Sequence, residues 1–239
     1  MIIKQVFDTF VSELKKRVGF LSEDNIRFYW FASMLKQDQD LNHYSLEEPY
    51  GVNIPGNKEL DLMYKDGIER WCIEIKFHRN PNGRTFALPQ SAGEIFDDIR
   101  RLPSWSNGES DGIPTRYFFL YVTDDEMHKY LSNSANRKSA YRDSLADFYN
   151  LAVGAVKGFT FEDSPNGDTP KTFFHQALES YTAGVQHELQ TPNVIMVASN
   201  DITCPSSSMK KIDSKSPINC HIRLYEVMGK GSVLSMQMK

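Results

Sequence analysis

Residues 59–77 read ELDLMYKDGIERWCIEIKF, in which two runs rich in apolar and aromatic residues are separated by the turn sequence Lys65-Asp66-Gly67. In both runs, apolar and aromatic residues surround the charges. An Asp-Gly pair between two such runs is a strong signal for a β-hairpin. We therefore expect two adjacent strands, one at about residues 59–64 and one at about residues 71–77.

Three charged residues interrupt the apolar pattern of this hairpin: Asp61 in the first strand, and Glu74 and Lys76 in the second. Side chains alternate between the two faces of a strand, so these charges are expected to point away from the apolar side chains of Leu60, Leu62, Ile73 and Ile75. A strand covered by helices has little room for charge unless a ligand or mutual pairing offsets desolvation. The three charges are therefore expected to converge on a site.

A divalent cation would account for two carboxylates in such a place. Mg²⁺ prefers hard oxygen ligands, often one or two carboxylates together with water and substrate phosphate, and Asp61 and Glu74 can supply the protein's share. The metal would lower the pKa of an attacking water, and the Lys76 ammonium would stabilise negative charge on that water and on the phosphate. The alternative is a solvated ion pair across neighbouring strands, because Glu-x-Lys is common on strands.

This arrangement resembles the PD-(D/E)XK nuclease superfamily, in which an Asp at one strand end precedes Glu/Asp-x-Lys on the neighbouring strand. Here 74 − 61 = 13 residues separate the two carboxylates, and Leu60 stands where the family's name has Pro. The resemblance implies a restriction endonuclease-like fold and an endonuclease-type hydrolase that cleaves DNA with Mg²⁺, or with Mn²⁺ as an alternative. It is compatible with a restriction, defence or repair nuclease. Asp61, Glu74 and Lys76 would be its catalytic residues.

A helix is expected to begin near Ser22, where Ser22 or Asp24 can cap free backbone amides and apolar residues follow at helical spacing. Many members of the resembled family place an additional Glu on such a helix, facing the metal. Glu23 matches that position and is a candidate catalytic residue and metal ligand. Its alternative role is a negative charge that stabilises the helix N-terminus.

The loop after Lys76 carries two candidate nucleic-acid contacts, Arg79 and Arg84, within the turn-rich sequence of residues 78–84. Arginines at the edge of such a site can hold a phosphate backbone, and that contact would weaken with salt. A solvated loop with no function explains them equally well. Gln90, near the start of the next predicted helix, is a third candidate, because some members of the resembled family place a polar residue there. We attribute Arg100 and Arg101 to favourable charge at that helix's C-terminus.

The wider pattern predicts an α/β fold in which a mixed central β-sheet is flanked by helices. A strand ending at Pro49, a helix at residues 89–102 and a strand at residues 116–123 complete the order found in the resembled core. Residues 1–135 would form this nuclease-like core, together with an amphipathic N-terminal helix. Residues 136–239 would add a C-terminal α+β extension, with a helix at 136–153 and edge strands or a small sheet at 194–199 and 221–228, packed on the core as one continuous domain.

Composition sets the outer limits of these expectations. A chain of 239 residues with 40% hydrophobic residues can bury a full core. Its net charge of −4 and pI near 5.9 argue against a basic coat over the whole surface, while a local basic groove stays compatible. The three cysteines are Cys72, Cys204 and Cys220; they lack metal-ligand spacing and fit a reducing compartment.

We expect a cytoplasmic protein without membrane association, because no stretch approaches transmembrane length and charges interrupt the N-terminal apolar pattern. DNA is the expected partner, and a homodimer or a targeting partner protein both remain open. The competing functional class is a catalytically inactive module on the same fold that binds nucleic acid or protein. In that module the acids and Lys76 would form a structural ion network.

Overall fold

The computed structural model describes residues 1–17, 21–50, 58–78, 88–105, 111–132, 141–162, 173–179, 188–204 and 218–229. The main sheet consists of β1 (Tyr44–Pro49), β2 (Glu59–Lys65), β3 (Arg70–His78), β4 (Thr115–Thr123), β5 (Val156–Lys157), β8 (Val194–Cys204) and β9 (Ile218–Val227). These seven strands follow the order β1-β2-β3-β4-β9-β8-β5, while β6 (Thr160–Glu162) and β7 (Glu188–Gln190) form a separate two-stranded sheet. The predicted α/β class with a mixed sheet is confirmed.

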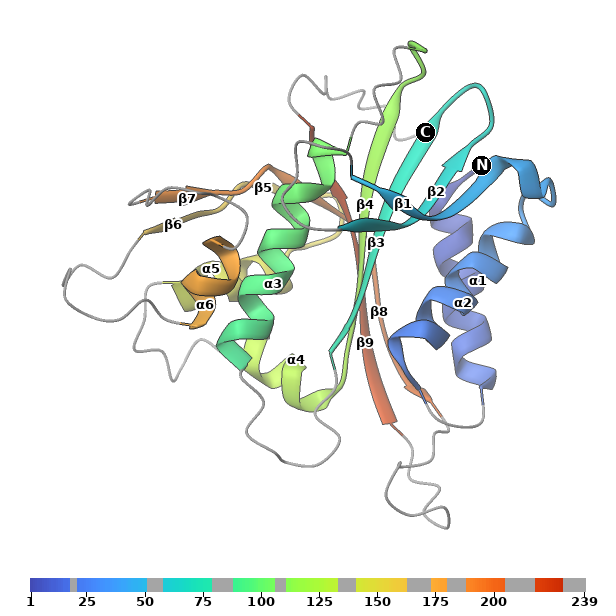
Figure 1. The fold of residues 1–239 in the computed structure, drawn as a ribbon. Helices are drawn as coiled ribbons and strands as arrows, with labels where there is room; N and C mark the ends of the chain where they lie inside the picture. Colours follow the sequence, from blue (N-terminus) through green and yellow to red (C-terminus); the bar gives the residue numbers. More distant parts are fainter. Residues whose placement is uncertain are drawn as a thin grey trace.

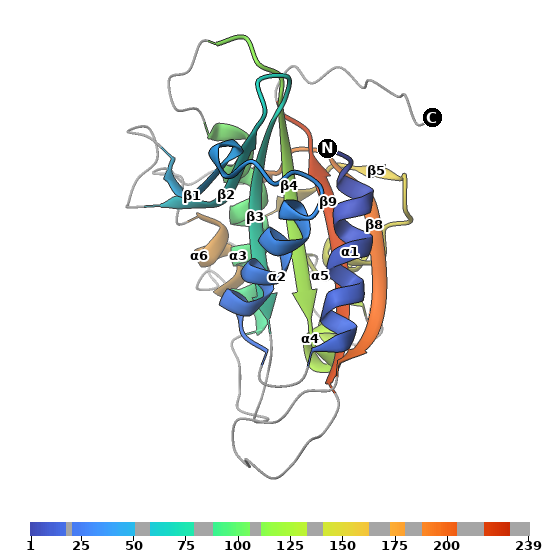
Figure 2. The same ribbon diagram turned by 90° about the vertical axis from the view of Figure 1, so that its right-hand side faces the viewer.

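Helices cover both faces of the main sheet, so the molecule has three layers (Figure 1). One face carries α1 (Ile3–Lys16) and α2 (Glu23–Leu35), which lie side by side in both views (Figure 2). The other face carries α3 (Leu88–Arg101), α4 (Asp125–Ser132), α5 (Tyr141–Tyr149) and α6 (Phe173–Glu179). Two short 3₁₀ segments lie at Leu41–His43 and Leu102–Ser104.

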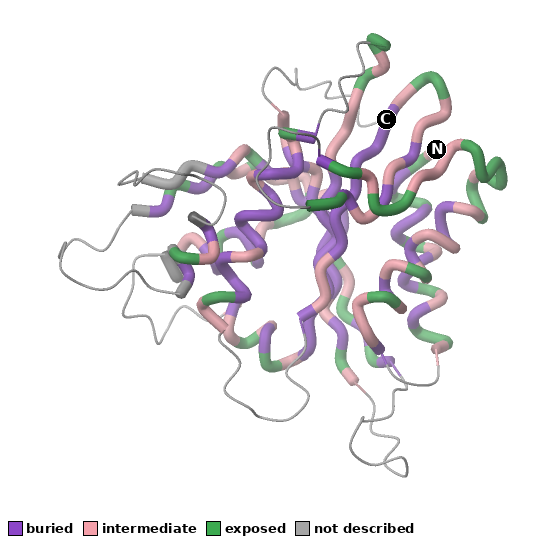
Figure 3. Tube along the Cα trace, in the orientation of Figure 1, coloured by how far each residue is buried: buried purple, intermediate pink, exposed green. Residues whose placement is uncertain are grey.

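Two hydrophobic cores lie on opposite faces of the sheet, and the buried residues accordingly concentrate along the strands and the inner sides of the helices (Figure 3). The α1-side core includes Val6, Phe10, Trp30, Ile73, Ile75 and Leu120. The α3-side core includes Leu60, Cys72, Phe96, Phe119, Tyr121 and Phe148. Within the described part of the chain, none of the helices combines the length and apolar character that a membrane crossing requires.

The two helices nearest the N-terminus form for the reasons visible in their sequences. α1 buries Val6, Phe10 and Leu14 at helical spacing and ends with basic residues in its last turn. α2 begins after Ser22, whose hydroxyl accepts a hydrogen bond from the backbone N–H of Asn25, while the Asn25 side chain accepts one from the Ser22 backbone. This reciprocal cap satisfies two amides at the helix start.

The predicted hairpin is present: β2 and β3 are antiparallel, with pairs running from Leu62 and Ile73 to Lys65 and Arg70. Next, β3 runs parallel to β4 over its whole length, and α3 lies between these two strands in the chain. A parallel neighbour requires such a crossover connection. The crossover brings α3 across the sheet face on which Glu74 and Lys76 lie.

The first strand of the hairpin bends at Asp61, which the sequence did not predict. Leu60 lies in the α3-side core and Leu62 in the α1-side core, so the expectation that they share one face is wrong at Leu60. The β1–β2 ladder has pairs at Leu46–Leu62 and Glu48–Leu60, and Glu47 between them has a φ of 55° in the left-handed region. The bend places Asp61 where β2 leaves β3, beside α2.

The C-terminal strands join the main sheet. The prediction of edge strands or a small sheet for residues 221–228 is wrong, because β9 lies between β4 and β8 in the middle of the sheet. The predicted helix at 136–153 is shorter where it is described: α5 ends at Tyr149, and Gly154 follows with a φ of 83°. Residues 133–140 lie outside the described part.

Candidate functional site

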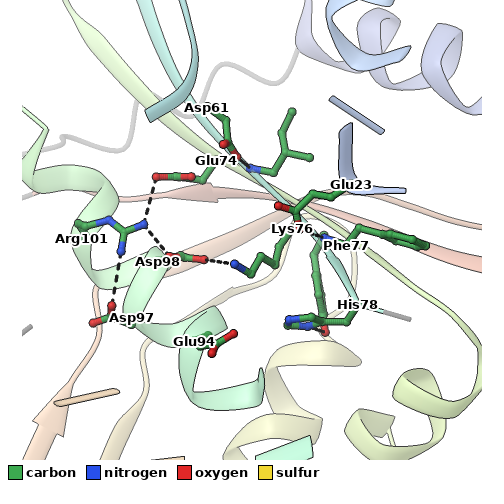
Figure 4. Close-up of polar contacts among 12 residues, drawn as sticks. Glu23, Asp61, Glu74, Lys76, Phe77, His78, Glu94, Asp97, Asp98 and Arg101 are labelled. Carbon is green, nitrogen blue, oxygen red and sulfur yellow. Dashed lines mark hydrogen bonds and ion pairs between the residues drawn. The ribbon is translucent and has the colours of Figure 1, made fainter. Parts of the chain in front are cut away.

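Asp61, Glu74 and Lys76 come together between α2 and α3 (Figure 4). Strand alternation puts Glu74 and Lys76 on the α3 side of β3, where both contact residues of that helix. The bend in β2 brings Asp61 to the same place from the neighbouring strand. The predicted convergence of these three side chains is therefore present.

Both carboxylate oxygens of Asp61 have partners. Oδ2 accepts a hydrogen bond of 2.7 Å from the backbone N–H of Ile75, and Oδ1 lies 2.7 Å from a guanidinium nitrogen of Arg27. The first contact fixes Asp61 to the strand that carries Glu74. The second ties it to α2.

Glu74 is buried and surrounded by residues that the sequence did not assign to the site. Its Oε1 accepts a hydrogen bond from the Tyr50 hydroxyl and lies 3.3 Å from the guanidinium of Arg101. Arg101 also contacts Asp98 at 2.6 Å and stacks over the Tyr50 ring at 5.0 Å from the ring centroid. These contacts hold the Glu74 carboxylate on the inner wall of the site.

The proximity of Asp61 and Glu74 disfavours two simultaneous negative charges. Burial raises the pKa of Asp61 to about 6, although Arg27 and the Ile75 N–H act in the opposite direction. Burial, followed by the charges of Asp61 and Asp98, raises the pKa of Glu74 well above its usual range despite Arg101. A hydrogen bond with Glu74 also lowers the pKa of Asp61. Burial thus disfavours full negative charge on both carboxylates at once, and a nearby positive charge relieves this.

Lys76 points across the site to α3, where its Nζ lies 3.6 Å from Asp98. Burial lowers the pKa of Lys76, but the charges of Asp98, Glu23, Glu94 and Glu74 outweigh that effect and raise it above its usual value. The side chain is 26% exposed. Lys76 is therefore an ammonium at neutral pH, with its charged end reachable from solvent.

Glu23 lies at the start of α2 and is connected to the site through Arg27. One oxygen of Glu23 accepts a 3.1 Å hydrogen bond from the backbone N–H of Phe77, and the other lies 3.0 Å from the Arg27 nitrogen that also contacts Asp61. Glu23 thus reaches β3, as its predicted position at the site requires. Its role as a metal ligand stays a prediction.

A cleft of about 570 Å³ opens beside Lys76. Its lining includes Lys58, Lys76, Gln90, Glu94, Asp98 and Gln176. The exposed amide of Gln90 donates to Glu94 at 3.3 Å. The cleft therefore connects the ammonium of Lys76 with the first turn of α3, where Gln90 was predicted to contact nucleic acid. The other predicted contacts, Arg79 and Arg84, lie outside the described residues.

Arg27, Tyr50, Asp98 and Arg101 are the residues of this site that the sequence analysis missed. Attributing Arg101 to the helix end was wrong, because its side chain is 5% exposed and contacts Glu74, Asp97 and Asp98. A usable signal was present: Asp97, Asp98 and Arg101 occupy adjacent turns of one helix, and Arg27 follows Glu23 by four residues. Whether these sides of α2 and α3 face the strands depends on how each helix packs on the sheet.

The donor set of the site fits a divalent cation that binds oxygen. Among the described residues, no group of three or more His, Cys, Asp and Glu side chains is arranged to hold a metal ion. Mg²⁺ needs only one or two carboxylates when water and substrate supply the rest, and Asp61 and Glu74 form such a pair. A bound cation would offset the negative charge of this buried pair. The residues present are thus compatible with Mg²⁺ or Mn²⁺.

Comparisons with protein-family models, with curated proteins and with solved structures find no match to this chain.

Proposed function

We propose that this protein is a metal-dependent nuclease of the PD-(D/E)XK type that hydrolyses phosphodiester bonds in DNA. The observation that carries the proposal is the meeting of Asp61, Glu74 and Lys76 beside an open cleft, on two antiparallel strands followed by a helix and a parallel strand. The order of elements and the residue types agree with the resemblance drawn from the sequence.

Asp61 and Glu74 would hold the cation. Mg²⁺ bound there would lower the pKa of a water molecule and polarise the scissile phosphate ester. Burial suits the pair for this task, because carboxylates in a low-dielectric environment gain more from a cation than solvated ones do. The Ile75 N–H and the contacts of Tyr50 and Arg101 fix the orientation of the two carboxylates before substrate arrives.

Lys76 would act as a fixed positive charge. Because its pKa is raised, it does not serve as a general base at neutral pH. Its ammonium instead donates hydrogen bonds to the attacking water or to a phosphate oxygen and stabilises the negative charge that develops there. The 3.6 Å contact with Asp98 is long for an ion pair, so Lys76 can turn toward a phosphate at small cost.

The cleft supports access of a phosphate group to Lys76. Lys58 and Lys76 are the cations among its lining residues, and Gln90 and Gln176 offer neutral amides. Glu94 and Asp98 are unfavourable neighbours for phosphate, so binding in the cleft depends on the lysines and on the divalent cation. Arg79 and Arg84, which follow β3 in the sequence, are proposed as additional phosphate contacts.

The decisive test is cleavage of supercoiled plasmid and of single-stranded DNA by the wild type and by Lys76→Ala, with Mg²⁺, Mn²⁺ or EDTA. We expect metal-dependent cleavage by the wild type and a loss of about 100-fold or more in the variant, the usual scale for removing one group that stabilises transition-state charge. Lys157→Ala is a matched control, because Lys157 is also ion-paired but lies on β5. It should cut like the wild type.

A second candidate function has one observation in its favour: every charge of the site has a partner within the described residues. Arg27 contacts Asp61, Arg101 contacts Glu74, and Lys76 contacts Asp98. Such a network is also what a catalytically inactive binding module would keep. A protein that cuts no DNA with any metal, and whose melting temperature does not change with Mn²⁺ or Ca²⁺, would support the module, because a ligand that binds only the native state must stabilise it.

A further inference from the structure

One nitrogen of Arg27 bridges the two carboxylates that approach the site from α2 and β2. Nη2 lies 2.7 Å from Asp61 Oδ1 and 3.0 Å from Glu23 Oε1. Both acids were expected from the sequence to be metal ligands. The guanidinium therefore occupies Oδ1 of Asp61, while Oδ2 accepts the hydrogen bond from the Ile75 N–H. A metal ion that binds Oδ1 must compete with Arg27 for it.

Carboxylates outnumber cationic side chains around the site. Arg27 contacts Glu23, Asp24 and Asp61, and Lys76 contacts Asp98. Arg101 contacts Glu74, Asp97 and Asp98, and Arg100 also contacts Asp97. This excess of negative charge favours a divalent cation, which can bind at Asp61 while Arg27 remains with Glu23.

Arg27 can leave Asp61 more easily than Arg101 can leave Glu74. The Arg27 side chain is 37% exposed, and Glu23 one turn earlier on α2 can keep hold of it after the contact with Asp61 breaks. Arg101 is 5% exposed, contacts three carboxylates and stacks on Tyr50. The two arginines therefore differ in role: Arg101 is a permanent part of the wall, and Arg27 is exchangeable.

We propose that Arg27 is an internal competitor of the divalent cation at Asp61, which holds this carboxylate in place while the metal is absent and moves aside when the metal binds. The inference rests on the proposed metal-dependent function and assigns Arg27 as a positioning residue of that site. The contact between Arg27 and Asp61 lowers the apparent affinity for the cation, because the cation binds only the state in which Arg27 has left Asp61.

The test is calorimetric titration of metal-free protein with Mn²⁺ for the wild type, Arg27→Gln and Arg27→Gln/Asp61→Asn. We expect Arg27→Gln to bind Mn²⁺ about tenfold more tightly, the effect of removing one charge-assisted hydrogen bond from the metal-free state. The added Asp61→Asn change should abolish the gain. Arg116→Gln is the matched control, since Arg116 is 39% exposed and pairs with Glu226 on another part of the sheet. It should leave Mn²⁺ affinity unchanged.

An equal or weaker Mn²⁺ affinity in Arg27→Gln would overturn the inference. Should that variant fail to fold, the guanidinium NMR signals of Arg27 in the wild type give the answer: saturation with Mg²⁺ should shift them and leave those of Arg116 in place. Unchanged Arg27 signals would refute the exchange. DNA cleavage by the wild type separates the proposed nuclease activity from the proposed role of Arg27. If the wild type cuts DNA but its Arg27 signals do not shift with Mg²⁺, only the competitor role is overturned. Tighter Mn²⁺ binding by Arg27→Gln without any cleavage overturns the nuclease alone.

Discussion

His78, the last residue of β3, is a buried imidazole two residues beyond Lys76. Its Nδ1 lies 2.9 Å from the hydroxyl of Tyr121, and the residue is 5% exposed. Burial, together with the charge of Lys76, lowers the pKa of His78 to about 3. The imidazole is therefore neutral in the folded protein at any pH near neutrality.

Because His78 is buried in its neutral form, we expect the unfolding free energy of the protein to fall as the pH is lowered. Below pH 6.5 the unfolded chain binds a proton at His78 that the folded protein binds only near pH 3, so acid favours the unfolded chain. Relative to His78→Gln, the wild type should lose about 1.4 kcal/mol of unfolding free energy per pH unit below about pH 6.5. Urea denaturation at pH 7, 6 and 5 measures the difference in unfolding free energy between the wild type and His78→Gln. The contributions of the other titrating groups are common to both proteins and cancel in this difference. A constant difference over this range would contradict the prediction.

At the level of single residues, the sequence predicted those side chains whose position follows from strand alternation. Glu74 and Lys76 share a face of β3 because they are two residues apart, and the Asp-Gly turn places the strand that carries Asp61 beside β3. The bend that brings Asp61 itself to the site was not predictable from this pattern. Arg27 and Arg101 come from helices, and only the packing of a helix on the sheet decides which of its charged faces meets the strands. That packing depends on contacts distant in the sequence.

α3 depends on a glycine in its middle because α6 crosses it closely. A Cβ built on Gly93 would lie 2.3 Å from the carbonyl oxygen of Phe174 and 2.8 Å from the Cβ of Ala177. The first atom belongs to the backbone and cannot rotate away. Gln176 of α6 also lines the cleft beside Lys76, so α6 forms part of the cleft wall.

We therefore expect Gly93→Ala to destabilise the protein by about 1–3 kcal/mol, the usual cost of forcing extra volume into packed structure. The sign is diagnostic, because helix propensity alone predicts that Ala stabilises a helix interior by about 1 kcal/mol relative to Gly. Urea denaturation measures the effect, and Gln90→Ala on the exposed side of the same helix is the control, expected within about 0.5 kcal/mol of the wild type. A stabilised Gly93→Ala protein would show that α6 leaves room for a Cβ at position 93.

The helices and strands themselves were predictable to the extent that their pattern is local. α1, α2, α3 and the strands β1 to β4 follow periodicities that the sequence displays, whereas the short strands β5, β6 and β7 have no such pattern. The central place of β9 was not predictable, because its own residues 218–227 do not encode which strand lies beside them. Pairing of β9 with β4 joins segments about a hundred residues apart.

The whole molecule is organised by one sheet that belongs to both cores. β4 contributes Phe119 and Tyr121 to the α3-side core, and Phe118, Leu120 and Val122 to the α1-side core. Unfolding of either layer therefore exposes apolar surface on strands that the other layer needs. That residues 1–135 and 136–239 form one continuous domain stays a prediction.

We expect urea to unfold both layers in a single transition. Trp30 and Trp71 lie in the α1-side core and Trp105 in the α3-side core, so fluorescence can report each side separately. Trp105→Phe leaves signals from the first side, and Trp30→Phe/Trp71→Phe leaves a signal from the second. Circular dichroism of each variant gives the urea midpoint for loss of its secondary structure. The fluorescence midpoint of the same variant should coincide with it. Two separated midpoints within one variant would show that the layers unfold independently.

The central position of β9 also has a consequence for synthesis on the ribosome. The strand that completes the edge of β4 begins 218 − 123 = 95 residues after β4 ends. At common elongation rates, β4 waits about 5–20 s with an unpaired edge while the intervening chain is made. An open apolar edge invites pairing with another chain. We therefore expect the yield in a cell to respond to the supply of chaperones and to the speed of translation between residues 124 and 217.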